Sequence, residues 1–181
     1  MEIEVKARLK DREGVITKLK ELGCEFGVSK TQDDTVYAQN IGTVEEYYSN
    51  SVFLRIRIQD DGKVIFTAKQ PIRKSASELV KVEHESEISS ADEMREMLKM
   101  MGYREAVRTK KTRQIGHYND YEICLDDIEG LGSFIEIEKI AEENIARMIQ
   151  KEMLEFLISL GTSPEDQVMK GYDILQLEQK I

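Results

Sequence analysis

The chain begins with a strand pattern in which every second side chain is charged. Its first nine residues read Met-Glu-Ile-Glu-Val-Lys-Ala-Arg-Leu. At the strand period of two, the charged face carries Glu2, Glu4, Lys6 and Arg8. Glu and Lys are depleted in ordinary strands, so such a strand either has one wet face or presents its charges to a shared space. A single strand favours the wet face, whereas recurrence in separate strands favours the shared space.

The same alternation returns along most of the chain. Further strands are predicted over residues 24–39, 52–59, 64–69, 80–88, 103–118, 121–126 and 134–139. With the first strand included, the acids on the charged faces are Glu2, Glu4, Glu83, Glu85, Glu87, Asp126, Glu136 and Glu138. The bases are Lys6, Arg8, Arg55, Arg57, Lys69, Lys81, Lys111 and Arg113. This repetition indicates that the charged faces of different strands border one space.

Amphipathic helices are predicted between and after these strands. Three run from about residues 11 to 23, 90 to 102 and 142 to 161, each ending at a glycine, and a short helix follows Ser163-Pro164. Helices can cover the apolar faces of about eight strands, which leaves the charged faces to a common interior if the sheet closes. If the sheet closes, we expect a barrel with a charged interior and helices packed outside. The 181 residues are expected to form a single domain, residues 1–181.

The charge balance and the cysteines limit the partners and the compartment. A net charge of -9 disfavours binding to long nucleic acid or to an anionic membrane. No apolar stretch approaches the roughly 18 to 20 residues that a membrane helix needs. Cys24 and Cys124 are too few and too far apart for a disulfide framework, and the N-terminus does not resemble a signal run. We expect a reduced, cytoplasmic protein.

A charged interior constrains what the barrel can hold. Burying an ion costs several kcal/mol unless it is paired, so the interior should be wet or filled by a highly charged ligand. A polyphosphate with a divalent metal fits both sets of residues, because carboxylates bind hard cations while Arg and Lys bind phosphate oxygens. His84 and His117 leave little room for a His-based zinc site, which favours Mg²⁺ or Mn²⁺. The sequence contains no glycine-rich phosphate loop.

The order of these charged motifs resembles a known family. Glu2-Ile-Glu-Val-Lys6 is similar to the Glu-x-Glu-x-Lys signature of the CYTH family, the triphosphate tunnel metalloenzymes, which include class IV adenylyl cyclases and thiamine triphosphatases. The later motifs that follow the family's order are Arg55-Ile-Arg57, Lys69 before Pro71, Glu83-His-Glu85, Lys111-Thr-Arg113, Asp126 and Phe134-Ile-Glu136-Ile-Glu138. The resemblance therefore covers almost the whole chain. It implies an α+β fold, an eight-stranded antiparallel closed β-barrel with a charged interior and helices packed outside, whose tunnel binds a triphosphate with divalent metal.

The resemblance also implies roles for individual residues. As catalytic residues it implies Glu2, Glu4, Lys6 and Glu136. As metal ligands it implies Glu2, Glu4 and Glu136, with Glu85, Asp126 and Glu138 as additional candidates. As triphosphate-binding residues it implies Lys6, Arg8, Arg55, Arg57, Lys69, Lys81, Lys111 and Arg113. For any one of these residues the alternative is an interior salt bridge that only balances charge.

The reaction stays open between three functions. A class IV adenylyl cyclase, which converts ATP to cyclic AMP and pyrophosphate, is preferred because the segment Leu125-Asp-Asp-Ile-Glu-Gly-Leu-Gly-Ser-Phe134 resembles the cyclase-like branch. The alternative is hydrolysis of thiamine triphosphate, inorganic triphosphate or a nucleotide. A non-catalytic polyphosphate-binding module is the third, and the presence of Glu2, Glu4 and Glu136 disfavours it. The expected partner is a small triphosphate, and whether the chain forms a homodimer stays open.

Overall fold

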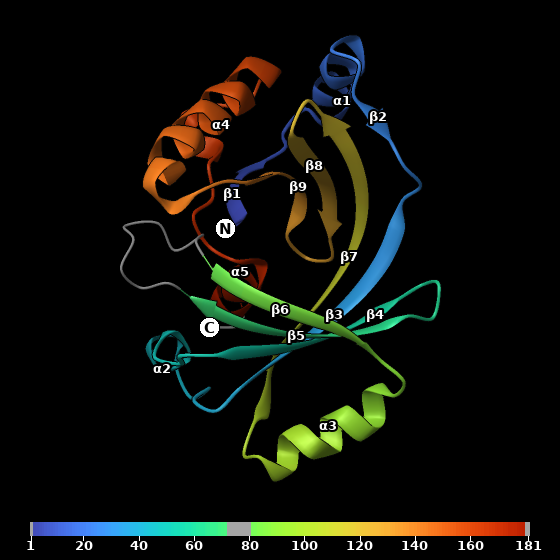
Figure 1. The fold of residues 1–181 in the computed structure, drawn as a ribbon, viewed down its shortest axis with the longest axis vertical. Coiled ribbons are helices and arrows are strands. Elements are labelled where there is room, and N and C mark those ends of the chain that lie inside the picture. Colours follow the sequence, from blue (N-terminus) through green and yellow to red (C-terminus); the bar gives the residue numbers. More distant parts are fainter. Residues whose placement is uncertain (1, 72–80, 180–181) are drawn as a thin grey trace.

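The computed structural model describes residues 2–71 and 81–179 as one curved sheet with helices around it (Figure 1). The strands are β1 (Glu2–Arg8), β2 (Glu25–Phe26), β3 (Lys30–Ala38), β4 (Phe53–Gln59), β5 (Val64–Pro71), β6 (Lys81–Ile88), β7 (Arg104–Tyr118), β8 (Tyr121–Ile128) and β9 (Gly132–Ile140). The α-helices are α1 (Arg12–Glu21), α2 (Val44–Tyr48), α3 (Ala91–Met100), α4 (Ala146–Leu160) and α5 (Tyr172–Glu178). Short 3-10 turns occur at Glu143–Ile145 and Pro164–Asp166.

Eight of the strands form a ring of antiparallel pairs around a central space. The order in the sheet is β2-β7-β3-β4-β5-β6-β1-β9-β8, and β7 also pairs with β8, which joins the ends. The predicted eight-stranded antiparallel fold is confirmed, but a closed barrel slightly overstates it. Within residues 2–71 and 81–179, the register of β1 and β6 contains the single pair Glu2 and Lys81. Because β1 pairs along its length with β9 and β6 pairs with β5, the sheet twist carries β1 and β6 apart beyond this pair.

The apolar faces of the strands point outward and are covered by helices. The helices α1 and α4 pack on β1, β8 and β9, and α3 packs below β4 and β5 (Figure 1). The core under α1 and α4 contains Ile3, Val5, Ala7, Val15, Leu19, Ile123, Leu125, Ile135, Ile137, Ile149, Met153 and Leu157. This arrangement leaves the inward strand faces to the charged residues, as the alternation predicts.

The helices α2 and α5, which lie outside the strands, add to what the sequence predicted. The loop expected at residues 40 to 51 contains α2, which starts where the Thr43 side chain accepts a hydrogen bond from the Glu46 amide. A five-residue helix is too short to show a periodic pattern. The helix α5 packs on both halves of the barrel, against Phe134 through Tyr172 and against Tyr47 through Ile174. Among the described residues, no helix combines the length and apolar character needed to cross a membrane.

Candidate functional site

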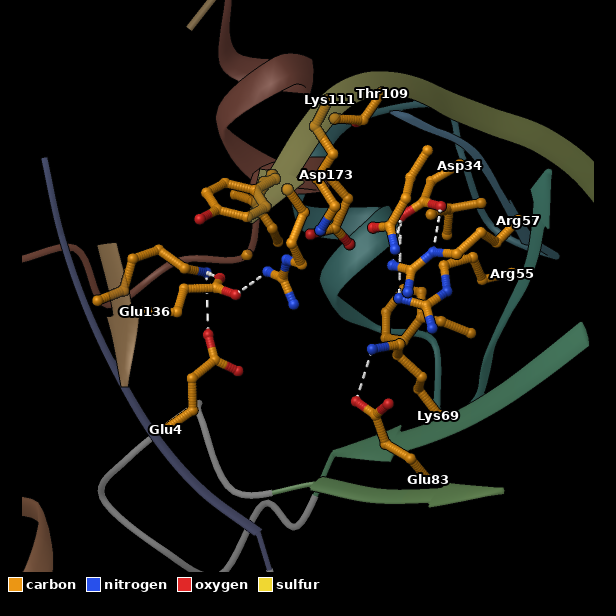
Figure 2. A pocket seen from close by; sticks show the side chains of 18 of the residues that line it. Glu4, Asp34, Arg55, Arg57, Lys69, Glu83, Thr109, Lys111, Glu136 and Asp173 are labelled. Carbon is orange, nitrogen blue, oxygen red and sulfur yellow. Dashed lines mark hydrogen bonds and ion pairs between the residues drawn. The ribbon is translucent and has the colours of Figure 1, made fainter. Parts of the chain in front are cut away.

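The inward faces of the strands line a cavity of about 1070 Å³. Figure 2 shows Glu4 and Glu136 on one side of this cavity, with Asp34, Arg55, Arg57, Lys69 and Glu83 facing them from the other. The first side comes from β1 and β9, and the second comes from β3 to β6. The long strand β7 runs between the two sides and contributes Thr109, Lys111 and Arg113. We call the first side the acidic wall, because its carboxylates outnumber its cations, and the second the basic wall, because it carries Arg55, Arg57 and Lys69. On the basic wall these three cations are matched in number by Asp34, Glu83 and Glu85.

On the acidic wall, Lys6 lies between two carboxylates. Its Nζ is 2.7 Å from Glu136 Oε1 and 3.0 Å from Glu4 Oε1. Burial by itself disfavours the charged amine, but Glu136 and Glu4 raise the pKa of Lys6 above its usual value. The same ammonium lies 4.0 Å from the centre of the Tyr172 ring. Lys6 is thus a fixed positive charge within the acidic wall.

The guanidinium of Arg113 is held by a fully buried carboxylate. Arg113 Nε donates to Asp126 Oδ1 at 2.7 Å, and its NH2 contacts both Asp126 and Glu136. The Tyr172 hydroxyl donates to Asp126 Oδ2 at 2.9 Å. Asp126 has no exposed surface and does not belong to the cavity lining. The predicted metal ligand Asp126 therefore lies behind the wall, where it orients Arg113 and Tyr172.

Glu138 lies among other carboxylates of the acidic wall, with Arg113 NH1 3.6 Å from its Oε1. Burial, followed by the negative charge of Glu136, raises the pKa of Glu138 to about 8. Ligand atoms of Glu122, Cys124 and Glu138 lie within 4.8 Å of one another, so this group could hold a metal ion. Burial raises the pKa of the Cys124 thiol far above its usual value, so carboxylate oxygens are the stronger donors here. Hard oxygen donors of this kind suit Mg²⁺ or Mn²⁺.

On the basic wall, each cation contacts an internal carboxylate. Arg57 donates from Nε and NH2 to the two Asp34 oxygens, at 2.7 and 2.8 Å. Arg55 NH2 is 2.6 Å from Glu85 Oε1. The Lys69 Nζ lies 2.6 Å from Glu83 Oε1 (Figure 2). These pairs mean that a bound anion would compete with carboxylates that are already in place.

Among the described cations of the cavity, Lys111 lies farthest from a carboxylate oxygen. It is buried, and its Nζ is 3.9 Å from the nearest recorded carboxylate oxygen, Asp126 Oδ2. Burial and the positive charge of Arg113 lower the pKa of Lys111 to about 8 from 10.5. A site of this kind favours a ligand that brings negative charge.

We expect the pKa of Lys111 to control stability at alkaline pH. Between about pH 8 and 10.5 the folded protein has lost a proton that the unfolded chain still binds, so stability rises with pH in this window. The Lys111→Met variant should lack this rise, which is on the order of 3 kcal/mol. Chemical denaturation of both proteins from pH 7 to 10.5 measures the difference. Lys110→Met, on the exposed outer face of β7, is the matched control, and wild-type and Lys111→Met curves that stay parallel would contradict the assignment.

The structure places the other predicted residues as follows. Glu2 and Glu85 line the cavity with the residues above. Arg8 does not line it: this exposed side chain donates to the Leu131 carbonyl at 3.1 Å and lies over the Phe134 ring. The interior position expected for Arg8 is therefore corrected, because the end of β1 has left the cavity. For Lys81, a predicted triphosphate-binding residue, the side chain does not belong to the described part of the structure.

Sequence reasoning missed several residues that line the cavity. Asp34 and Gln32 alternate inward on β3, and Thr109 precedes Lys111 at the same spacing on β7. In the described part of the chain, Gln32 Oε1 and Thr109 Oγ1 are buried without a hydrogen-bond partner. A buried polar atom without a partner costs about 1 to 3 kcal/mol, so water or a ligand is needed there. The strand period of two was the sequence signal that could have identified these cavity-lining residues.

Comparisons with known proteins agree on the architecture. The family model for the CYTH domain matches residues 1–172. The protein MJ0240 of Methanocaldococcus jannaschii, named provisionally as an adenylate cyclase, is 33% identical over 95% of this chain and 96% of its own length. The structure of PH1819 from Pyrococcus horikoshii superposes with a TM-score of 0.83 at 28% identity and covers 99% of both chains. HpAC1 from Hippeastrum, described as having a dominant triphosphatase activity, has a TM-score of 0.59 at 21% identity over 94% of this chain and 91% of its own.

Proposed function

This chain belongs to the CYTH family, and from that membership we propose that it is a divalent-metal-dependent enzyme that converts ATP to cyclic AMP and pyrophosphate. The observation that carries the proposal is the facing of an acidic and a basic wall across one cavity. A triphosphate with bound metal brings cations for the carboxylates of the acidic wall and anionic oxygens for the arginine and lysine donors of the basic wall and β7.

The basic wall and β7 supply donors for the phosphate chain. A guanidinium has five N–H donors, and Asp34 takes two from Arg57, which leaves three for a ligand. Lys111 is buried in the lining with little neutralisation, and Arg113 is held in place by Asp126. Hydrogen bonds to charged groups are short and strong, so these residues can hold a triphosphate in one position.

The residues present fit a hard divalent cation on the acidic wall. Glu4 and Glu138 are the proposed ligands, with Glu2, Glu122 and Glu136 bordering the same part of the cavity. Burial and then repulsion from Glu136 raise the pKa of Glu138, and a cation bound here would favour its charged form. When bound, the metal would neutralise charge on the phosphate oxygens.

The proposed reaction is an intramolecular displacement at the α-phosphorus. The ribose 3'-oxygen forms a bond to this phosphorus, the bond to the bridging oxygen of pyrophosphate breaks, and the hydroxyl proton passes to solvent. Lys6, Lys111 and Arg113 provide fixed positive charge where negative charge develops on oxygen. Such preorganised electrostatic stabilisation is a large contribution to catalysis.

The end of the cavity near α2 and α5 supports an organic substrate. Val36, Tyr48, Phe53 and Ile174 line the same cavity as the charged walls. Apolar and aromatic side chains beside a few polar groups are typical of small-molecule sites. Inorganic triphosphate has no group to place there, whereas a nucleoside does.

Triphosphate hydrolysis is the second candidate function. It is favoured by the triphosphatase activity described for HpAC1, which shares the fold. Water would then replace the ribose hydroxyl as nucleophile, at the terminal phosphorus, with the same charged residues. A non-catalytic polyphosphate-binding module is disfavoured because the carboxylates that would hold metal are retained.

Product analysis separates these functions. The purified protein is incubated with ATP, thiamine triphosphate or inorganic triphosphate, with Mg²⁺ or Mn²⁺, and the products are resolved by ion-exchange chromatography. We expect cyclic AMP and pyrophosphate from ATP in equal amounts, and no product with chelator present. If orthophosphate forms without cyclic AMP, the protein is a triphosphatase and the cyclase proposal is wrong. Binding of triphosphate without any turnover would leave only the binding module.

A further inference from the structure

Two consecutive aspartates on β3 form the same ion pair on opposite faces of the sheet. Asp33 accepts two hydrogen bonds from Arg108 on the outside, and Asp34 accepts two from Arg57 on the inside. The inner pair is buried, with 7% of Asp34 and 9% of Arg57 exposed, while Arg108 is exposed. The outer pair is an ordinary surface interaction, so the inner pair requires a separate explanation.

Asp34 lies within the group of cations to which the triphosphate is proposed to bind. Its Oδ2 is also 3.8 Å from Arg55 NH1, and Lys111 acts on it electrostatically (Figure 2). Arg55, Arg57 and Lys111 are all largely buried. Their positive charges repel one another. Asp34, together with the Glu85 carboxylate on Arg55, reduces this repulsion while the cavity is empty.

We propose that Asp34 is an internal counter-anion that takes the place of a ligand phosphoryl group on Arg57 in the empty protein. It stabilises the empty fold, and it weakens the binding of every anion that reaches the basic wall. This inference rests on the proposed function only in that a phosphate chain occupies the cavity. Its consequence is that Asp34 limits triphosphate affinity and promotes release of the anionic product.

A positioning role for Asp34 makes the opposite prediction. If Asp34 served mainly to orient the Arg57 guanidinium, its loss would weaken triphosphate binding. If Asp34 competes as an anion, its neutral isostere should strengthen binding, because the Coulomb repulsion between carboxylate and phosphate is removed. Asn keeps the shape and one oxygen that can accept from Arg57, so it changes the charge with little change of geometry.

The test compares Asp34→Asn with the matched control Asp33→Asn. Binding of inorganic triphosphate with Mg²⁺ is measured by calorimetry, and the melting temperature is measured with and without this ligand. We expect Asp34→Asn to bind about tenfold more tightly and to melt several degrees lower when empty, with the melting difference closing at saturating triphosphate. Asp33→Asn should bind as the wild type does. Unchanged or weaker binding by Asp34→Asn overturns the proposal.

Two further outcomes are informative. If Asp34→Asn does not fold alone, the proposal requires inorganic triphosphate to restore its folded signal, and a variant that stays unfolded with the ligand overturns it. If the wild type binds triphosphate but never processes ATP, the proposed function fails while tighter binding by Asp34→Asn still supports this inference. If the wild type makes cyclic AMP and Asp34→Asn binds no more tightly, the inference alone fails.

Discussion

The Glu4→Gln variant is expected to lose about a thousandfold in turnover while it keeps its fold. Glu4 faces the basic wall across the cavity, beside Glu136, and is proposed as a metal ligand (Figure 2). Loss of a ligand removes metal-dependent charge stabilisation of several kcal/mol, which corresponds to this rate change. Gln retains an oxygen that can accept from Lys6, so the acidic wall should stay assembled. Turnover is measured at saturating Mg²⁺ or Mn²⁺, together with the melting temperature.

Glu105→Gln provides the control for this variant. Glu105 lies on β7 with an exposed side chain outside the cavity lining, so its loss should leave turnover unchanged. Glu136→Gln is a poorer test than Glu4→Gln, because Glu136 is paired with both Lys6 and Arg113 and its loss would remove a counter-charge from two buried cations. Near-wild-type turnover of Glu4→Gln would remove Glu4 from the metal site.

The Arg57→Ala variant is expected to lose both triphosphate affinity and stability. A hydrogen bond to a charged group contributes about 1.5 to 3 kcal/mol, so the affinity should fall roughly tenfold to a hundredfold. The same change leaves Asp34 buried without its two donors, which costs about 3 to 5 kcal/mol when a buried pair is broken. Calorimetry with inorganic triphosphate and urea denaturation measure the two effects separately.

Arg108→Ala is the matched control for Arg57→Ala. It breaks the same geometry with the neighbouring aspartate, but on the exposed face, where an ion pair contributes about 0 to 1 kcal/mol. The double variant Asp34→Asn/Arg57→Ala should recover part of the stability, since no unpaired carboxylate remains. Unchanged triphosphate binding by Arg57→Ala would place Arg57 outside the ligand site.

The alternation of charged and apolar residues predicted which strand faces point inward and outward, and the family resemblance added the eight-stranded antiparallel arrangement. Ile3 and Val5 lie under the helices, and Glu4 and Lys6 line the cavity, because side chains on a strand point to opposite faces in turn. The same rule holds for Arg55 and Arg57 on β4. It failed at Arg8, because period alone does not say where a strand leaves the barrel.

Strand period therefore determined which residues face the interior, including most of the candidate site, because inward and outward positions are local properties of the chain. Tertiary structure alone decided which charges meet. Asp34 pairs with Arg57 through the register of β3 and β4, Asp126 lies behind Arg113, and α5 brings Tyr172 onto Lys6. These pairings join residues distant in sequence, and their distances and burial follow from strand register and sheet curvature, which periodicity does not determine.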